Sequence, residues 1–253
     1  MTKYLITGVS SGIGRSLTKK LIQKGGVVWG IARREELLKS LKKELLDNSS
    51  FIYSLADQAK DKDWKLLVEQ FKRKKFIPHV VIFNAAFSEN DLEKPINLSS
   101  LEKMVEVNFL GVMRGINHLL PIVKNNTQFI AISTFSALKG SGVEGIGYAA
   151  SKAALSIGFE SLYQKYKNKG LMFKTIYFGP INSGMNPFKG GIPFILSEKK
   201  AVELIINSIN SNKGQFFYPK TIFLIFKLIR LLPPNIYFKI LSRMERFHQK
   251  LQP

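Results

Sequence analysis

Cysteine is absent from the 253-residue chain, which excludes disulfides, thiolate nucleophiles and cysteine-ligated zinc. Its absence fits a reducing compartment. Histidine is scarce as well, because the chain has only His79, His118 and His248, which lie far apart in the sequence. A histidine-rich metal site is therefore not expected.

Acidic residues are few: 18 Asp and Glu stand against 38 Lys and Arg, for a formal net charge of +20. Such a balance can attract nucleic acid or anionic lipid. No base-reading motif or basic-aromatic platform accompanies the charge, so we expect no specific nucleic-acid partner. Many of the lysines, such as Lys39, Lys42 and Lys43, fit an ordinary solvated helix face.

Long apolar runs are also missing. The apolar run at the start of the sequence is too short for a signal peptide. Residues 222–232 are too short and too charged a segment to cross a bilayer. These features predict a cytoplasmic location, with peripheral attachment to a membrane as a further possibility. Apolar residues still make up 45% of the chain, enough for a sizeable core.

Short β-branched runs alternate with amphipathic segments over most of the chain. This alternation, with strands apolar on both faces, predicts one doubly wound α/β domain with a parallel, Rossmann-like sheet over residues 1–218. The predicted strands are 3–7, 27–31, 51–54, 80–83, 129–133, 174–178 and, as a possible last strand, 215–218. The predicted helices are 12–23, 35–46, 63–74, 101–123, 148–166 and 198–210.

The character of the chain changes after Gly184. Residues 184–196 form a loop rich in Gly, Pro and Phe, which we expect to cover a substrate. Residues 219–253 form a basic amphipathic tail with cations on one helical side, such as Lys239 and Arg243. Such a tail can lie on an anionic membrane, and it can equally pack on the domain or across a dimer.

A glycine cluster lies between the first predicted strand and the first predicted helix. Glycines at this place let the backbone turn tightly and approach a pyrophosphate, whose charge is met by the free N–H groups of the helix. A tight strand–helix turn without a ligand has the same appearance, and the spacing departs from the Gly-x-Gly-x-x-Gly fingerprint. The candidate cofactor-binding residues are Gly8, Ser10, Ser11, Gly12, Ile13 and Gly14.

Two arginines follow the second predicted strand, where NAD-preferring proteins place an acid. The segment 29–34 contains no acid, and Arg33 and Arg34 stand where a guanidinium can bind a 2′-phosphate. NADP(H) is therefore the expected cofactor and NAD(H) the less favoured one. The alternative interpretation is two solvated arginines at the start of a helix.

Tyr148 and Lys152 lie four residues apart in a predicted helix, so their side chains share one face. The pKa of a free tyrosine is near 10, so its use as a base near pH 7 requires that pKa to fall by about 3. A neighbouring ammonium ion can lower it.

Taken in order, these motifs resemble the short-chain dehydrogenase/reductase family over about Thr2 to Tyr218. The resemblance implies that Asp57 contacts the adenine, and that Asn84 and Ala85 lie beside the cofactor. It also implies that Asn108 anchors a water in a proton relay, and that Ile181 and Ser183 belong to the segment holding the nicotinamide carboxamide. Asp57 can alternatively cap the next helix, and Asn108 can be an ordinary buried amide.

In the family, the catalytic hydroxyl follows the fifth strand as the second serine of a pair. Here the pair is Ser133 and Thr134, so Thr134 takes that position, with Ser133 and Ser136 as alternatives. A threonine keeps the hydroxyl but is stiffer.

The resemblance implies an NADP(H)-linked oxidoreductase acting on the CH–OH group of an alcohol or on a carbonyl, and a homo-oligomer. The apolar residues of 184–196 suggest a hydrophobic substrate. The alternative is a regulatory protein that binds NADP(H) without turnover.

Overall fold

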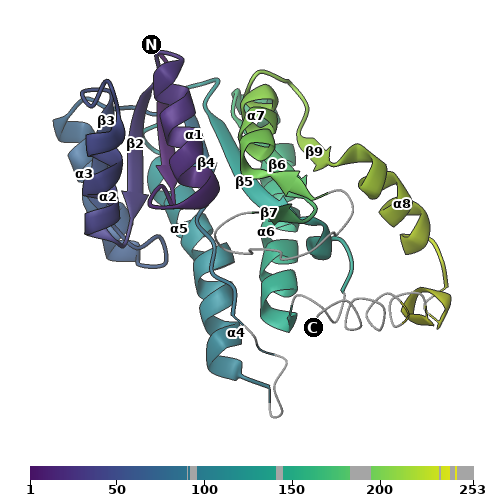
Figure 1. Ribbon diagram of the computed structural model, residues 1–253. Coiled ribbons are helices and arrows are strands. Elements are labelled where there is room, and N and C mark those ends of the chain that lie inside the picture. Colours follow the sequence, from purple (N-terminus) through teal and green to yellow (C-terminus); the bar gives the residue numbers. More distant parts are fainter. Residues whose placement is uncertain are drawn as a thin grey trace.

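The computed structural model describes residues 1–89, 91, 96–140, 145–182, 195–233, 235–239 and 243. A seven-stranded, wholly parallel sheet lies at the centre, with helices on both faces (Figure 1). In spatial order the strands are β3 (Phe51–Leu55), β2 (Val27–Ala32), β1 (Lys3–Thr7), β4 (Val80–Phe83), β5 (Gln128–Thr134), β6 (Met172–Phe178) and β9 (Gln215–Tyr218). The predicted doubly wound sheet is confirmed.

Two hydrophobic layers hold the helices to the sheet, because alternate strand residues enter opposite layers. Ile6 and Ile82 face one layer, and Leu5 and Val81 face the other; all four are fully buried. The first layer is closed by α1 (Gly12–Gln23), α2 (Glu35–Glu44) and α7 (Glu198–Ile209). The second is closed by α3 (Asp61–Arg73), α5 (Gly111–Leu119) and α6 (Ile146–Tyr166).

The helix predicted over 101–123 differs from the structure. The helical run begins earlier, as α4 (Leu98–Val105), and ends earlier, at Leu119 in α5. Between these helices lies a π-helical turn, η1 (Glu106–Leu110). Hydrophobic periodicity does not reveal such a turn, because it inserts a residue without changing the apolar character of the segment.

The order of the strands fixes where a site can form. From β1 the chain builds outward to β2 and β3, then crosses to β4 and builds in the other direction. Ligands of open α/β sheets bind at the carboxyl ends of the strands where the order reverses. Here that place lies between the ends of β1 and β4, at Thr7 and Phe83.

Beyond β9, the tail begins with α8 (Lys220–Arg230), which packs on the domain. The Phe223 ring stacks on Phe217 of β9, and the Phe226 ring stacks on Phe135, just after β5. Within the described part of the chain, no helix is long and apolar enough to cross a membrane.

Lys174 of β6 is a buried lysine outside the switch point, and it is 1% exposed. Its Nζ donates to the carbonyls of Ser208 and Ile209 at 3.0 Å, to Gln128 Oε1 at 2.7 Å and to the Ser211 carbonyl. Burial lowers the pKa of Lys174 to about 8. The ammonium group thus satisfies the carbonyls at the end of α7.

Replacing Lys174 by Met is expected to lower the free energy of unfolding by about 3 kcal/mol, because several buried acceptors lose their donor. Urea unfolding measures the change. Lys199→Met, an exposed position at the start of α7, is the control and is expected to change stability by less than about 0.5 kcal/mol. Equal small changes in both variants would contradict the capping role.

Candidate active site

The glycine loop between β1 and α1 follows the predicted course. Gly8 and Gly12 have φ angles of +76° and +52°, in the left-handed region that favours glycine. A Cβ at Gly8 would lie 2.8 Å from the Ala85 Cα, so a side chain there would separate the ends of β1 and β4. The Thr7 hydroxyl, in turn, accepts a hydrogen bond from the Ala85 amide at 3.0 Å.

Asn84 holds this junction together. Its Nδ2 donates to the carbonyls of Thr7 at 3.1 Å and Gly8 at 3.2 Å. A Cβ on Gly14 would lie 2.6 Å from the same nitrogen, so Asn84 and Gly14 fit only as a pair. Asn84 therefore holds the glycine loop against the end of β4.

The start of α1 is open to an anion. No acid lies in its first turn, and the Ser11 side chain makes no capping hydrogen bond, so the first amides keep their donors free of a side-chain cap. Arg34 Nη2 lies beside them and donates to Ser10 Oγ at 2.9 Å and Ser11 Oγ at 2.8 Å. Arg33, 59% exposed, lies 4.0 Å from Asp57.

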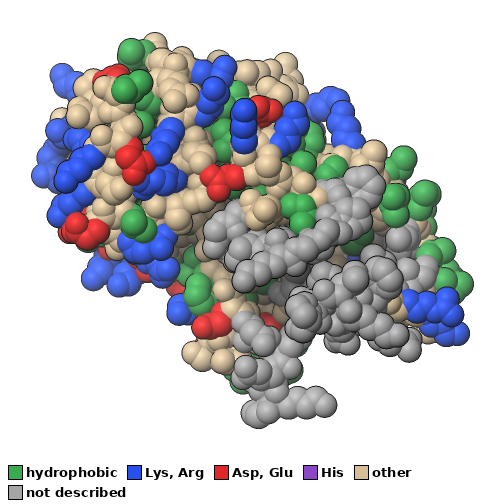
Figure 2. Space-filling view, in the orientation of Figure 1, with side chains coloured by type: hydrophobic (Ala, Val, Ile, Leu, Met, Phe, Trp, Pro, Cys, Tyr) green, Lys and Arg blue, Asp and Glu red, His purple; other side chains and the backbone are tan. Residues whose placement is uncertain are grey.

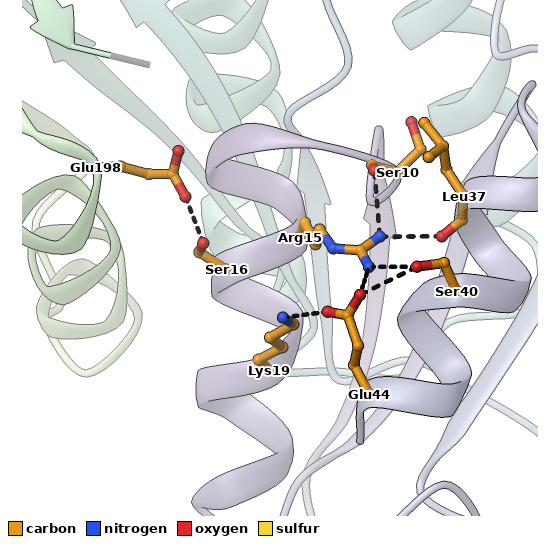
Figure 3. A network of polar contacts seen from close by, with 8 residues as sticks. All are labelled: Ser10, Arg15, Ser16, Lys19, Leu37, Ser40, Glu44 and Glu198. Carbon is orange, nitrogen blue, oxygen red and sulfur yellow. Dashed lines mark hydrogen bonds and ion pairs between the residues drawn. The ribbon is translucent and has the colours of Figure 1, made fainter. Parts of the chain in front are cut away.

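Arg15 of α1 also holds the glycine loop in place, as Figure 3 shows. Its guanidinium donates to the carbonyls of Ser10 at 3.4 Å and Leu37 at 3.0 Å, and it pairs with Glu44 of α2. Hydrogen bonds from Lys19 and Arg15 hold the pKa of Glu44 down, at about 2. The network joins α1 to α2, and the sequence pattern did not reveal it because Arg15 reads as a solvated helix residue.

The segment after β3 carries the predicted adenine contact. Asp57 Oδ1 accepts from the Ala59 amide at 3.0 Å, which shapes the turn. The N-cap position of α3 is Lys60, three residues after Asp57, so Asp57 does not cap that helix. The neighbouring Gln58 is buried, and its Nε2 donates to the carbonyls of Ala85 and Val107, each at 3.0 Å. Gln58 thus joins the segment after β4 to η1, and the sequence analysis did not predict this role.

Asn108 lies in the π-helical turn and is fully buried. Its Oδ1 accepts from the Phe87 amide at 2.8 Å, and its Nδ2 donates to the Phe87 carbonyl at 2.9 Å and to Ser151 Oγ at 3.0 Å. Ser151 Oγ donates onward to the Tyr148 carbonyl at 2.9 Å. One N–H group of the amide therefore holds the segment around Phe87, and the other positions α6 through Ser151.

Tyr148 and Lys152 lie one turn apart in α6, as predicted. The Lys152 Nζ is 5.9 Å from the centre of the Tyr148 ring and donates to the Ile132 carbonyl of β5 at 2.8 Å. Lys152 is 2% exposed, and burial lowers its pKa to about 8. Because α6 begins at Ile146, Tyr148 lies within its first turn.

The two candidate hydroxyls after β5 have different surroundings. Ser133 Oγ lies 2.8 Å from Ser156 Oγ, inside the contact between β5 and α6. Thr134 ends the strand, and its Oγ1 accepts from Ser136 Oγ at 3.2 Å. Ser133 thus takes part in helix packing, whereas Thr134 stands at the carboxyl edge of the sheet.

Beyond β6, the chain forms a short parallel pair, β7 (Ile181–Asn182) with β8 (Leu196–Ser197). Ile181 is half-buried at its start, where the nicotinamide contact is predicted. Ser183 lies outside the described residues, as does the expected substrate loop except for Ile195 and Leu196. Directly after β8, Glu198 of α7 accepts a hydrogen bond from the Ser16 hydroxyl of α1 (Figure 3).

The strand order, the glycine loop and the Tyr-x₃-Lys pair can be compared with known proteins. The profile of the short chain dehydrogenase family matches residues 2–190. The chain belongs to the short chain dehydrogenase family. No group of three or more His, Cys, Asp or Glu that could hold a metal ion occurs in the part of the chain that the structure describes.

Curated relatives cover most of the chain. An NADPH-dependent pterin aldehyde reductase of Arabidopsis thaliana is 28% identical over 181 residues, or 71% of this chain and 74% of that protein. An uncharacterised oxidoreductase of Listeria monocytogenes is 30% identical over 179 residues, or 70% and 72%.

Solved structures confirm the short-chain dehydrogenase fold. A short chain dehydrogenase of Burkholderia cenocepacia in complex with NADP has a TM-score of 0.77 at 18% identity, covering 85% of this chain and 95% of that one. A short-chain dehydrogenase of Sphingobium yanoikuyae in complex with NADPH has a TM-score of 0.76 at 16% identity, covering 87% and 89%.

Proposed function

We propose that this protein interconverts a carbonyl compound and its alcohol with NADP(H) as the cofactor. One observation carries the proposal: a buried Lys152 lies one helical turn from Tyr148, at the edge of the sheet that also holds the open glycine loop. This is where a phenol would meet the nicotinamide end of a dinucleotide.

The residues of the loop fit a pyrophosphate and a 2′-phosphate. The first turn of α1 offers backbone donors and contains no acid of its own, and Gly8 and Gly14 let the loop lie close against Ala85 and Asn84. Arg34, held over Ser10 and Ser11, supplies a guanidinium for the 2′-phosphate. The relatives named for NADPH or solved with NADP support the same choice.

When bound, NADP(H) supplies or accepts the hydride. In the reductive direction, Tyr148 gives its proton to the oxygen of the substrate carbonyl as the alcohol forms. Thr134 donates a hydrogen bond to the same oxygen and stabilises the charge that develops there. Asn108 acts as a positioning residue, through Ser151 to the backbone of Tyr148.

Lys152 lowers the pKa of the Tyr148 phenol as long as its own ammonium group is charged. Because burial lowers the pKa of Lys152 to about 8, this charge is present below pH 8 and is lost as the pH rises through it. Reductive kcat/KM is therefore expected to fall on the alkaline side of about pH 8, measured from pH-rate profiles. A flat profile across this pH range would contradict the assignment.

The substrate is proposed to be hydrophobic, because apolar side chains such as Phe135, Phe226 and Ile181 lie near the ends of β5 and β6. We also propose a homo-oligomer, as the family resemblance implies.

A panel of ketones, aldehydes and alcohols, followed by NADPH absorbance with NADH in parallel, tests the proposal. Turnover with NADPH on at least one hydrophobic carbonyl, and weaker turnover with NADH, is the expected result. Tight NADPH binding without turnover on any member would favour a regulatory protein that binds the cofactor.

A further inference from the structure

The tail exposes an unusual amount of large apolar surface. Leu224, Ile225 and Leu228 of α8 are 60%, 54% and 60% exposed, and Leu231, which follows, is 77% exposed. Ile236 adds a further exposed position at 48%. We call these five residues the tail face. Figure 2 shows hydrophobic side chains gathered at the edge of the molecule where α8 lies.

The opposite side of α8 is anchored to the domain. The ring centres of Phe223 and Phe217 are 3.7 Å apart, and Phe226 stacks on Phe135. Farther on, Tyr237 is fully buried and its hydroxyl donates to the Gly140 carbonyl at 2.9 Å. The helix α8 is therefore attached to the domain through its other side. The tail face is not needed for this attachment.

Basic residues border the tail face. Lys220 and Lys227 are exposed and lie four residues before and three residues after Leu224, so they neighbour it on the helix surface. Lys239 and Arg243 are exposed farther along. Over residues 219–253 the sequence has seven Lys and Arg against one acid, Glu245.

This charge decides between the possible occupants of the tail face. A second copy of the chain would bring like charges together, on a protein of net charge +20. An anionic lipid surface instead offers headgroups to the lysines and an acyl boundary to the leucines. We propose that the tail face and its bordering lysines dock this protein on an anionic lipid bilayer.

Docking there places the site beside the lipid. Phe226, on the domain side of α8, stacks on Phe135, and Phe135 directly follows Thr134. A hydrophobic substrate dissolved in the bilayer would then have a short way to the carboxyl edge of the sheet. This last point rests on the proposed reaction, whereas the docking itself does not.

Co-sedimentation of the full chain with vesicles tests the docking. The probes are phosphatidylcholine vesicles with and without phosphatidylglycerol, at low and at physiological salt. Wild-type protein is expected to bind the anionic vesicles and to bind them less at higher salt. Leu224→Ser with Leu228→Ser should weaken that binding by about tenfold or more, since it removes apolar area from the acyl boundary.

A second pair of variants keeps the test independent of folding. Lys220→Gln with Lys227→Gln changes only exposed charges and should weaken binding to anionic vesicles by about tenfold. The matched controls are exposed residues far from the tail, in α3 and in the segment after α2: Leu46→Ser with Leu66→Ser, and Lys62→Gln with Lys65→Gln. Both control pairs should bind as the wild type does.

Three results would overturn the proposal: no wild-type binding to anionic vesicles, equal losses in the control pairs, or a dimer in ultracentrifugation that Leu224→Ser with Leu228→Ser dissociates without any effect on vesicle binding. Turnover of a water-soluble carbonyl should be unchanged in all four pairs. Failure of the docking is thus distinguishable from failure of the proposed reaction.

Discussion

Tyr148→Phe is expected to lower reductive kcat/KM by about a thousandfold, because the carbonyl oxygen loses its proton donor while the ring stays in place. The loss should appear mainly in kcat. The affinity for NADPH, measured by fluorescence titration, should change by less than about threefold, since removing one hydroxyl leaves the glycine loop and Arg34 untouched.

Tyr163→Phe is the matched control for this variant. Tyr163 lies in the same helix and is half-buried against the second hydrophobic layer, away from the carboxyl edge of the sheet. It should retain wild-type turnover. Full turnover of Tyr148→Phe on an identified substrate, or an equal loss in Tyr163→Phe, would remove Tyr148 from the reaction.

Replacing both Arg33 and Arg34 by Ala should raise KM for NADPH by about 100-fold and leave KM for NADH within about threefold. The guanidinium of Arg34 already lies over Ser10 and Ser11 at the start of α1, where a charge-assisted contact to a 2′-phosphate adds to the backbone donors. NADH has no such phosphate, so it loses nothing comparable. Steady-state kinetics with both cofactors measures the change.

Arg73→Ala, at the exposed end of α3, controls for the loss of positive charge. It should leave both KM values unchanged, because a distant surface charge is screened by salt. A parallel rise in KM for both cofactors in the double variant would mean that the arginines hold the loop and do not read the phosphate.

The strands and the cofactor loop could be predicted from the sequence because local chemistry determines them. Buried parallel strands are short apolar runs, and a loop that must turn tightly under Ala85 requires glycine at Gly8. The pair of Tyr148 and Lys152 could be predicted for the same reason, because helical spacing alone puts the two side chains on one face.

The rest depended on contacts between distant segments. Gln58 reads as a loop residue, yet it donates to carbonyls 27 and 49 residues away. Ser133 and Thr134 are neighbours with the same chemistry, and only the position of Ser156 across the layer distinguishes them. The π-helical turn around Asn108 is set by packing, which periodicity does not describe.

A crystal structure of the protein with NADP⁺ tests the central claim most directly. The account predicts the pyrophosphate at the start of α1, the 2′-phosphate on Arg34, and the nicotinamide ribose within hydrogen-bond distance of both Tyr148 Oη and Lys152 Nζ. A nucleotide bound elsewhere, or a Tyr148 phenol turned away from the nicotinamide, would contradict it.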